Sequence, residues 1–89
     1  MCYSENITIP CELTGRMIHN LVYFVQGLGS SVYFAANNRT VSGKSMIGVL
    51  SLGLNKGNEV KVSVVNDDQV IGKEELWNIV RFVRELGDV

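Results

Sequence analysis

The sequence predicts an α+β fold in which a four-stranded antiparallel sheet is covered on one face by three helices. Three observations lead to this prediction. Residues 3–9 and 59–65 alternate apolar and polar side chains with the period of two that half-buried strands require. Two other segments repeat apolar residues at helical spacing, and a pair of asparagines between two short apolar runs indicates a hairpin. The predicted order of elements is β-α-β-β-α-β-α.

The first strand and the first helix occupy the N-terminal third. Residues 3–9 form the strand, and Pro10 ends it. From residue 18 the apolar period becomes helical, and Gly27 with Gly29 supplies the C-terminal stop. The apolar side chains on one face of this strand are Tyr3, Ile7 and Ile9. The apolar stripe of the helix comprises Ile18, Leu21, Val22, Val25 and Leu28.

The middle of the chain contains the hairpin and a short helix. Residues 31–35 and 39–41 are the two hairpin strands, joined by Asn37 and Asn38, which tolerate positive φ. Residues 45–52 begin with a serine of the type favoured as an N-cap and end before a glycine, so we expect a helix of about two turns.

The last strand and the last helix complete the sheet and its cover. Residues 59–65 alternate Val60, Val62 and Val64 with polar side chains, and a turn of asparagine and aspartates follows. We expect Glu74 and Glu75 in the first turn of the last helix and Gly87 at its end. The apolar stripe of this helix comprises Leu76, Ile79, Val80, Val83 and Leu86, with Arg81 and Arg84 toward its C-terminus.

Length and composition limit the classes of function. The chain has 89 residues, a formal net charge of -1 and no linker or repeat, so we expect one domain over residues 1–89. The charge gives no general attraction to nucleic acid, and no apolar run is long enough to span a membrane, so we expect a cytoplasmic protein. Cys2 and Cys11 lack metal-ligand spacing, so we expect free thiols, no metal and no cofactor. A single histidine, with no nucleophile motif beside it, also argues against an enzyme.

One segment is similar to a known protein family. Residues 43–53, GKSMIGVLSLG, followed by Asn55, Lys56 and Gly57, resemble the regulatory-serine segment of HPr phosphocarrier proteins, whose pattern is close to K-S-I-M-G-V-M-S-L-G-x-x-K-G. The element order agrees over nearly the whole chain. The resemblance implies the HPr-like open-faced β-sandwich and a connection with the sugar phosphotransferase system.

The resemblance also implies a degenerate phosphoryl-transfer site. The family carries G-L-H-A-R-P-A at the start of its first helix, where the histidine accepts the phosphoryl group, and here the segment is GRMIHNL. Met17 takes the place of the histidine, His19 that of the arginine and Asn20 that of the proline. Because a thioether cannot form the labile phosphorus–nitrogen bond that a carrier passes on, we expect no phosphoryl transfer at Met17. His19 lies about 200° around the helix from Met17 and is not expected at the same point.

Ser45 has two interpretations that are compatible. From the residues alone it is an N-cap, and from the resemblance it is a regulatory serine that HPr kinase phosphorylates, with Lys44 beside the phosphate. In the family the phosphorylated protein binds a LacI/GalR-type catabolite-control transcription factor, and Met46, Ile47 and Leu50 resemble the apolar docking residues. Apolar residues at this spacing also occur in a core.

Three hypotheses for the function follow. The first is a non-enzymatic regulatory or adaptor protein, similar to the catabolite-repression HPr subgroup, that is switched at Ser45. The second is a working phosphocarrier that uses His19. The third is a constitutive interaction module in which Met17, Ile18 and the Met46 and Leu50 side chains form an apolar patch for a partner or a second copy. The expected state is a monomer or a weak homodimer, without direct contact to nucleic acid or membrane.

Overall fold

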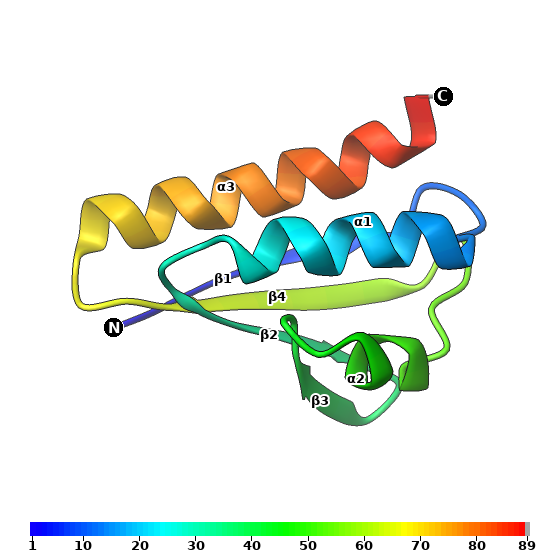
Figure 1. Cartoon of the computed structure of the whole chain (residues 1–89), viewed down its shortest axis with the longest axis horizontal. Helices are drawn as coiled ribbons and strands as arrows, with labels where there is room; N and C mark the ends of the chain where they lie inside the picture. The colour runs from blue at the N-terminus through cyan, green and yellow to red at the C-terminus, as the bar shows by residue number, and fades with distance from the viewer. Residues whose placement is uncertain (89) are drawn as a thin grey trace.

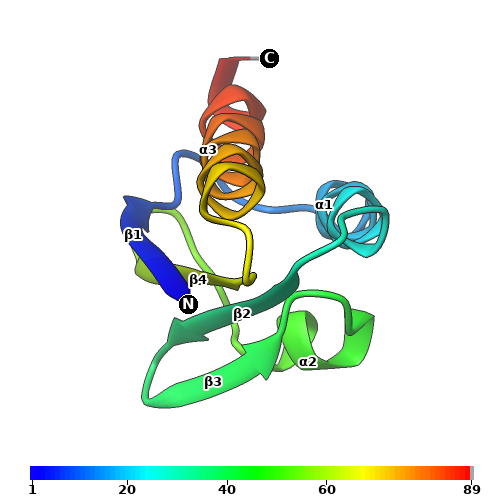
Figure 2. The same cartoon turned by 90° about the vertical axis from the view of Figure 1, so that its left-hand side faces the viewer.

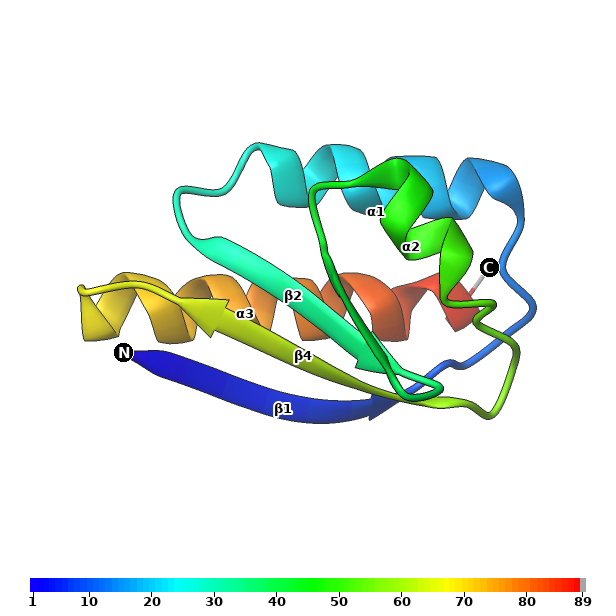
Figure 3. The same ribbon diagram turned by 90° about the horizontal axis from the view of Figure 1, so that it is seen from below.

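The computed structural model describes residues 1–88. The strands are β1 (Cys2–Thr8), β2 (Ser31–Ala36), β3 (Arg39–Ser42) and β4 (Glu59–Val65). The helices are α1 (Gly15–Gln26), α2 (Met46–Ser51) and α3 (Gln69–Glu85), and a 3-10 turn, η1 (Leu86–Asp88), follows α3. All three strand pairs are antiparallel, and the order across the sheet is β1-β4-β2-β3 (Figures 1 and 3).

The helices cover one face of the sheet, as the sequence predicts. Viewed from the end of the sheet, α3 lies over β1 and β4, and α1 lies beside α3 and above α2, which packs beside β3 (Figure 2). The core between the layers is almost entirely aliphatic, with Phe34 as its buried aromatic residue. The other face of the sheet is open to solvent and carries mainly polar side chains, which an antiparallel sheet permits.

The alternation of apolar and polar side chains in β1 and β4 is confirmed. Tyr3 pairs with Val64 and Ile7 pairs with Val60 in the register of β1 and β4. Ile7, Val60 and Val64 are buried, and Tyr3 packs against the core. On the open face, the hydroxyls of Ser4 and Ser63 lie 2.9 Å apart. The period of two therefore separates the core face from the solvent face correctly.

The hairpin turn is also confirmed. Asn37 and Asn38 have φ of 52° and 64°, the left-handed region that asparagine adopts more readily than most residues. Asn37 has a second role, because its side-chain amide donates to the Leu52 carbonyl at 2.7 Å. The turn between β2 and β3 is thus attached to the C-terminal end of α2.

Both long helices begin earlier than their apolar periods predict. α1 begins at Gly15, not at residue 18, because the Thr14 hydroxyl caps it by accepting from the Met17 amide at 3.1 Å. α3 begins at Gln69 because the Asp68 carboxylate accepts from the Ile71 amide at 3.0 Å. The placement of Glu74 and Glu75 in the first turn was therefore wrong. Leu86 also lies beyond the end of α3, in η1.

Gly43, directly after β3, lies close to two side chains of the core. The Gly43 amide donates to the Val32 carbonyl at 2.8 Å, and a Cβ at Gly43 would meet Val32 Cγ1 at 2.9 Å and Phe34 Cε2 at 3.1 Å. Both neighbouring side chains are buried. We expect Gly43→Ala to lower the free energy of unfolding by about 2 kcal/mol in urea denaturation, because core overpacking typically costs about 1–3 kcal/mol.

The control for this prediction is Gly15→Ala. A Cβ at Gly15 would meet nothing within 4 Å. The free energy of unfolding of the Gly15→Ala variant is expected to differ from that of the unchanged protein by less than about 1 kcal/mol, the range of helix-propensity effects. Equal stability of the two variants would show that Val32 and Phe34 do not close around Gly43.

Candidate functional site

The N-terminal turn of α1 carries the residues that the sequence assigns to a degenerate transfer site. Met17 is the third residue of the helix and is half-buried. Its backbone amide is already used by the Thr14 cap. Ile18 is 8 % exposed and belongs to the core. The assignment of Ile18 to an exposed docking patch was therefore wrong, because the helical period turns this side chain inward.

His19 and Asn20 lie on the solvent side of the same turn. Both are exposed, and the imidazole of His19 stacks on the ring of Tyr23, with 6.4 Å between centroids and 25° between planes. Because residues 17–20 are all helical, His19 is rotated about 200° from Met17 around the axis. The structure therefore does not bring the His19 ring to the position of the Met17 side chain.

Ser45 is the N-cap of α2. Its hydroxyl accepts a hydrogen bond from the Gly48 amide at 3.1 Å, and its carbonyl accepts from the Val49 amide at 3.0 Å. The capping prediction is confirmed. Gly48 fits this arrangement closely, since a Cβ there would lie 3.2 Å from the Ser45 hydroxyl oxygen and 3.2 Å from Val41 Cβ.

Lys44 makes a contact that the sequence does not indicate. Its Nζ donates to the Leu28 carbonyl at 2.9 Å, just beyond the C-terminal end of α1. Its own carbonyl accepts from the side-chain amide of Gln26 at 3.0 Å. A cation at this end of α1 is favourable for the helix dipole. The ammonium expected beside a Ser45 phosphate is thus bonded to the segment that follows α1 in the unmodified protein.

The side chains of α2 divide between core and surface. Val49 is 1 % exposed, and Met46 is half-buried and packs against the core. Ile47 is 82 % exposed and Leu50 is 48 % exposed. Such large apolar side chains on a two-turn helix leave an apolar patch beside Ser45, which we call the α2 patch (Ile47 and Leu50).

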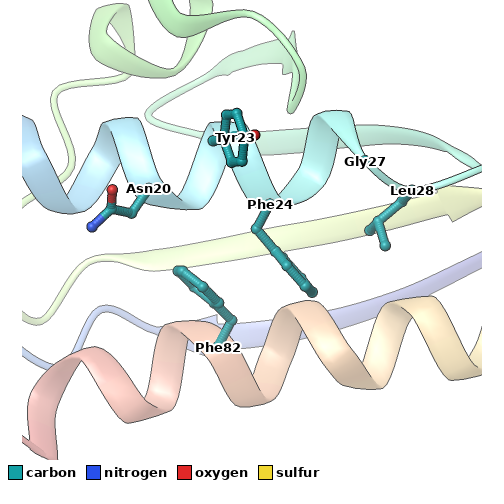
Figure 4. Close-up of a pocket in the computed structure, with 6 residues that line it drawn as sticks. All are labelled: Asn20, Tyr23, Phe24, Gly27, Leu28 and Phe82. Carbon is teal, nitrogen blue, oxygen red and sulfur yellow. The ribbon is translucent and has the colours of Figure 1, made fainter.

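A shallow groove of about 590 Å³ lies between α1 and α3, and no pattern in the sequence indicates it. Its floor is the stacked pair Phe24 and Phe82, whose centroids are 4.9 Å apart (Figure 4). Its other lining residues are Asn20, Tyr23, Gly27 and Leu28. The apolar period alone predicts Phe24 and Phe82 only as helix residues, because a contact between two helices is not encoded in either one.

The connection from α1 to β2 is attached to α3 by Glu75. The carboxylate accepts from the amides of Gly29 at 3.2 Å and Ser30 at 3.0 Å, and also from the Ser30 hydroxyl. Ser30 is 2 % exposed, and its hydroxyl oxygen also accepts from the side-chain amide of Asn66 at 2.9 Å. Ser30 is the buried polar residue of the core region, and these hydrogen bonds provide partners for its amide and its hydroxyl.

The described residues contain few other groups that could carry chemistry. Within residues 1–88, no cluster of three histidine, cysteine or acidic side chains could hold a metal ion. Cys2 and Cys11 are free thiols, as the sequence predicts. No helix in the described part of the chain has both the length and the apolarity that a membrane crossing requires.

The antiparallel sheet covered on one face by three helices defines the class of fold as an open-faced β-sandwich. The sequence model of the PTS HPr component phosphorylation site family matches residues 4–83. The chain therefore belongs to the HPr family of the phosphotransferase system. Members of this family are phosphocarriers and not enzymes, in agreement with the prediction from the sequence. None of the curated proteins is similar enough in sequence to match.

Solved structures of HPr proteins share this fold. The phosphocarrier protein HPr from Bacillus anthracis str. Ames superposes with a TM-score of 0.81 at 17% identity, covering 91% of this chain and 95% of that chain. HPr-C-His from Thermoanaerobacter tengcongensis gives 0.75 at 26% identity, covering 91% and 93%. A structure described as an HPr dimer from the same organism gives 0.63 at 28% identity, covering 84% and 91%.

Proposed function

We propose that this protein is a regulatory or adaptor member of the HPr family that does not relay a phosphoryl group and that is switched by phosphorylation at Ser45. The proposal rests on one observation above the others. Met17 occupies the third position of α1, where the family pattern has its histidine, and the one histidine of the chain is rotated to a different side of the helix. A thioether offers no nitrogen for a transferable bond to phosphorus.

The surroundings of Met17 support the same interpretation. His19 stands where the family pattern has an arginine, and its ring stacks on Tyr23. The planar cationic fork of an arginine, which holds two phosphate oxygens at once, is replaced by an imidazole ring, which has no such fork of donors. Two components of a phosphoryl-transfer site are therefore replaced together.

Ser45 is suited to the alternative modification. The expected donor is ATP, used by a kinase of the HPr kinase type. The Ser45 hydroxyl oxygen forms a new bond to the γ-phosphorus, the bond from that phosphorus to the β–γ bridging oxygen breaks, and ADP leaves. The hydroxyl proton passes to a base of the kinase. The phosphate then takes the place of the hydroxyl that caps α2, at the end of the helix where negative charge is favourable.

The α2 patch and Met17 form the proposed contact surface. Ile47 and Leu50 lie within five residues of Ser45 and are exposed. A partner that covers them gains apolar burial and senses the phosphate at the same time. The family resemblance makes a LacI/GalR-type catabolite-control transcription factor the proposed partner, with HPr kinase as the modifying enzyme. The predicted state is a monomer or a weak homodimer, and a neighbour described as an HPr dimer supports the second form.

Incubation with HPr kinase and ATP tests the switch. We expect one phosphate per chain in the unchanged protein and at least a hundredfold less incorporation in Ser45→Ala, measured by intact mass. Ser51→Ala is the matched control, because Ser51 is an exposed serine on the same helix whose hydroxyl donates to the Gly48 carbonyl at 2.6 Å. Equal labelling of Ser45→Ala, or no labelling of the unchanged protein, would contradict the proposal.

A further inference from the structure

Lys44 connects the surroundings of Ser45 with the segment that follows α1. We call residues 28–30, between α1 and β2, the linker. The Lys44 ammonium donates to the Leu28 carbonyl at 2.9 Å, and the Lys44 carbonyl accepts from Gln26 at 3.0 Å. Lys44 is half-buried, so its charged end lies against the linker and not free in solvent.

The linker is also held by α3. The amides of Gly29 and Ser30 donate to the Glu75 carboxylate at 3.2 and 3.0 Å. One cation, from the connection between β3 and α2, and one anion, from α3, therefore fix three consecutive residues. Loss of either charged partner leaves backbone groups of the linker without their hydrogen bonds.

The linker also forms one end of the groove between α1 and α3. Leu28 lines this groove together with Phe24 and Phe82, and the three side chains lie along the same opening (Figure 4). The carbonyl that accepts from Lys44 belongs to the same residue. A displacement of the Leu28 backbone therefore changes the apolar lining of the groove.

We propose that Lys44 transmits a negative charge on Ser45 to the linker and to this groove, an inference that rests on the proposed phosphorylation of Ser45. A phosphate adds a charge of about -1.5 to -2 one residue away from Lys44 and accepts stronger hydrogen bonds from an ammonium than a neutral carbonyl does. The Lys44 ammonium then leaves the Leu28 carbonyl for the phosphate oxygens. The linker keeps only its Glu75 contacts and opens to solvent more often.

The test uses the 89-residue chain with phosphoserine placed at position 45 by chemical synthesis, so that no kinase is involved. Amide hydrogen exchange at Gly29 and Ser30 is measured by NMR. We expect exchange about tenfold faster than in the unmodified chain, since a hydrogen bond to a charged group contributes enough to change a local opening equilibrium by roughly that factor. Unchanged exchange at both amides would overturn the proposal.

Two variants distinguish transmission through Lys44 from a general effect of charge. Lys44→Met removes the ammonium, so Gly29 and Ser30 should exchange faster without phosphate, and phosphoserine should add no further change. Lys61→Met removes an exposed lysine of β4 and should keep the full response to phosphoserine. A full response in Lys44→Met would contradict the role of Lys44. A response in the synthetic protein together with no modification by the kinase would contradict the proposed function alone.

Discussion

Replacing Glu75 with alanine is expected to lower the free energy of unfolding by about 3 kcal/mol. The carboxylate accepts three hydrogen bonds from Gly29 and Ser30, and the buried hydroxyl of Ser30 depends on it for an acceptor. Removing one partner of a buried bond leaves the other group unsatisfied, which costs roughly 1–3 kcal/mol for each group. Urea denaturation followed by circular dichroism measures the change.

Glu74→Ala is the matched control for this prediction. Glu74 is the neighbouring carboxylate on α3 and is exposed, so its removal should change the free energy of unfolding by no more than about 0.5 kcal/mol. Glu75→Gln keeps one acceptor oxygen and should fall between the other two variants. A Glu75→Ala protein as stable as Glu74→Ala would show that the linker does not need its attachment to α3.

Truncation of Ile47 is expected to reduce partner affinity at least about thirtyfold without changing stability. Ile47 is 82 % exposed, so Ile47→Ala removes few contacts within the fold and should change the free energy of unfolding by less than about 0.5 kcal/mol. An apolar residue that a partner covers at the centre of an interface typically contributes about 2 kcal/mol or more. Calorimetry with the Ser45-phosphorylated protein and a LacI/GalR-type catabolite-control factor measures the affinity.

Val70→Ala provides the comparison for Ile47→Ala. Val70 is a similarly exposed aliphatic residue, at 73 %, but it lies on α3 and far along the chain from Ser45. Its truncation should leave the affinity within about twofold of the unchanged protein. If both variants bind alike, the partner does not dock on the α2 patch.

Most of the fold follows from periodicity and turn chemistry. The alternation in β1 and β4 predicts which side chains face the core, and Asn37 with Asn38 predicts the hairpin, because both signals are local. The cap of α2 at Ser45 is local in the same way. The starts of α1 and α3 were misplaced because the first turn of each helix contains residues outside the apolar stripe, so only the caps at Thr14 and Asp68 mark them.

The contacts that organise the site are not local. Lys44 meets Leu28 across 16 positions and Glu75 meets Ser30 across 45, and no spacing rule connects such residues before the fold is known. The groove between Phe24 and Phe82 has the same origin. The third hypothesis places Ile18 in an exposed apolar patch, although the helical period also places it in the apolar stripe of the first helix, and the structure buries it.

The absence of an acceptor nitrogen at Met17 is the claim on which the proposed function depends. One measurement tests it most directly: the protein is incubated separately with phosphoenolpyruvate and the general phosphotransferase enzyme, and with ATP and HPr kinase, and the modified residue is mapped by mass spectrometry. The predicted result is an acid-stable phosphate ester on Ser45 from ATP and no labelling from phosphoenolpyruvate. An acid-labile phosphoryl group on His19 that passes to a downstream acceptor would contradict the proposal and identify the protein as a working phosphocarrier.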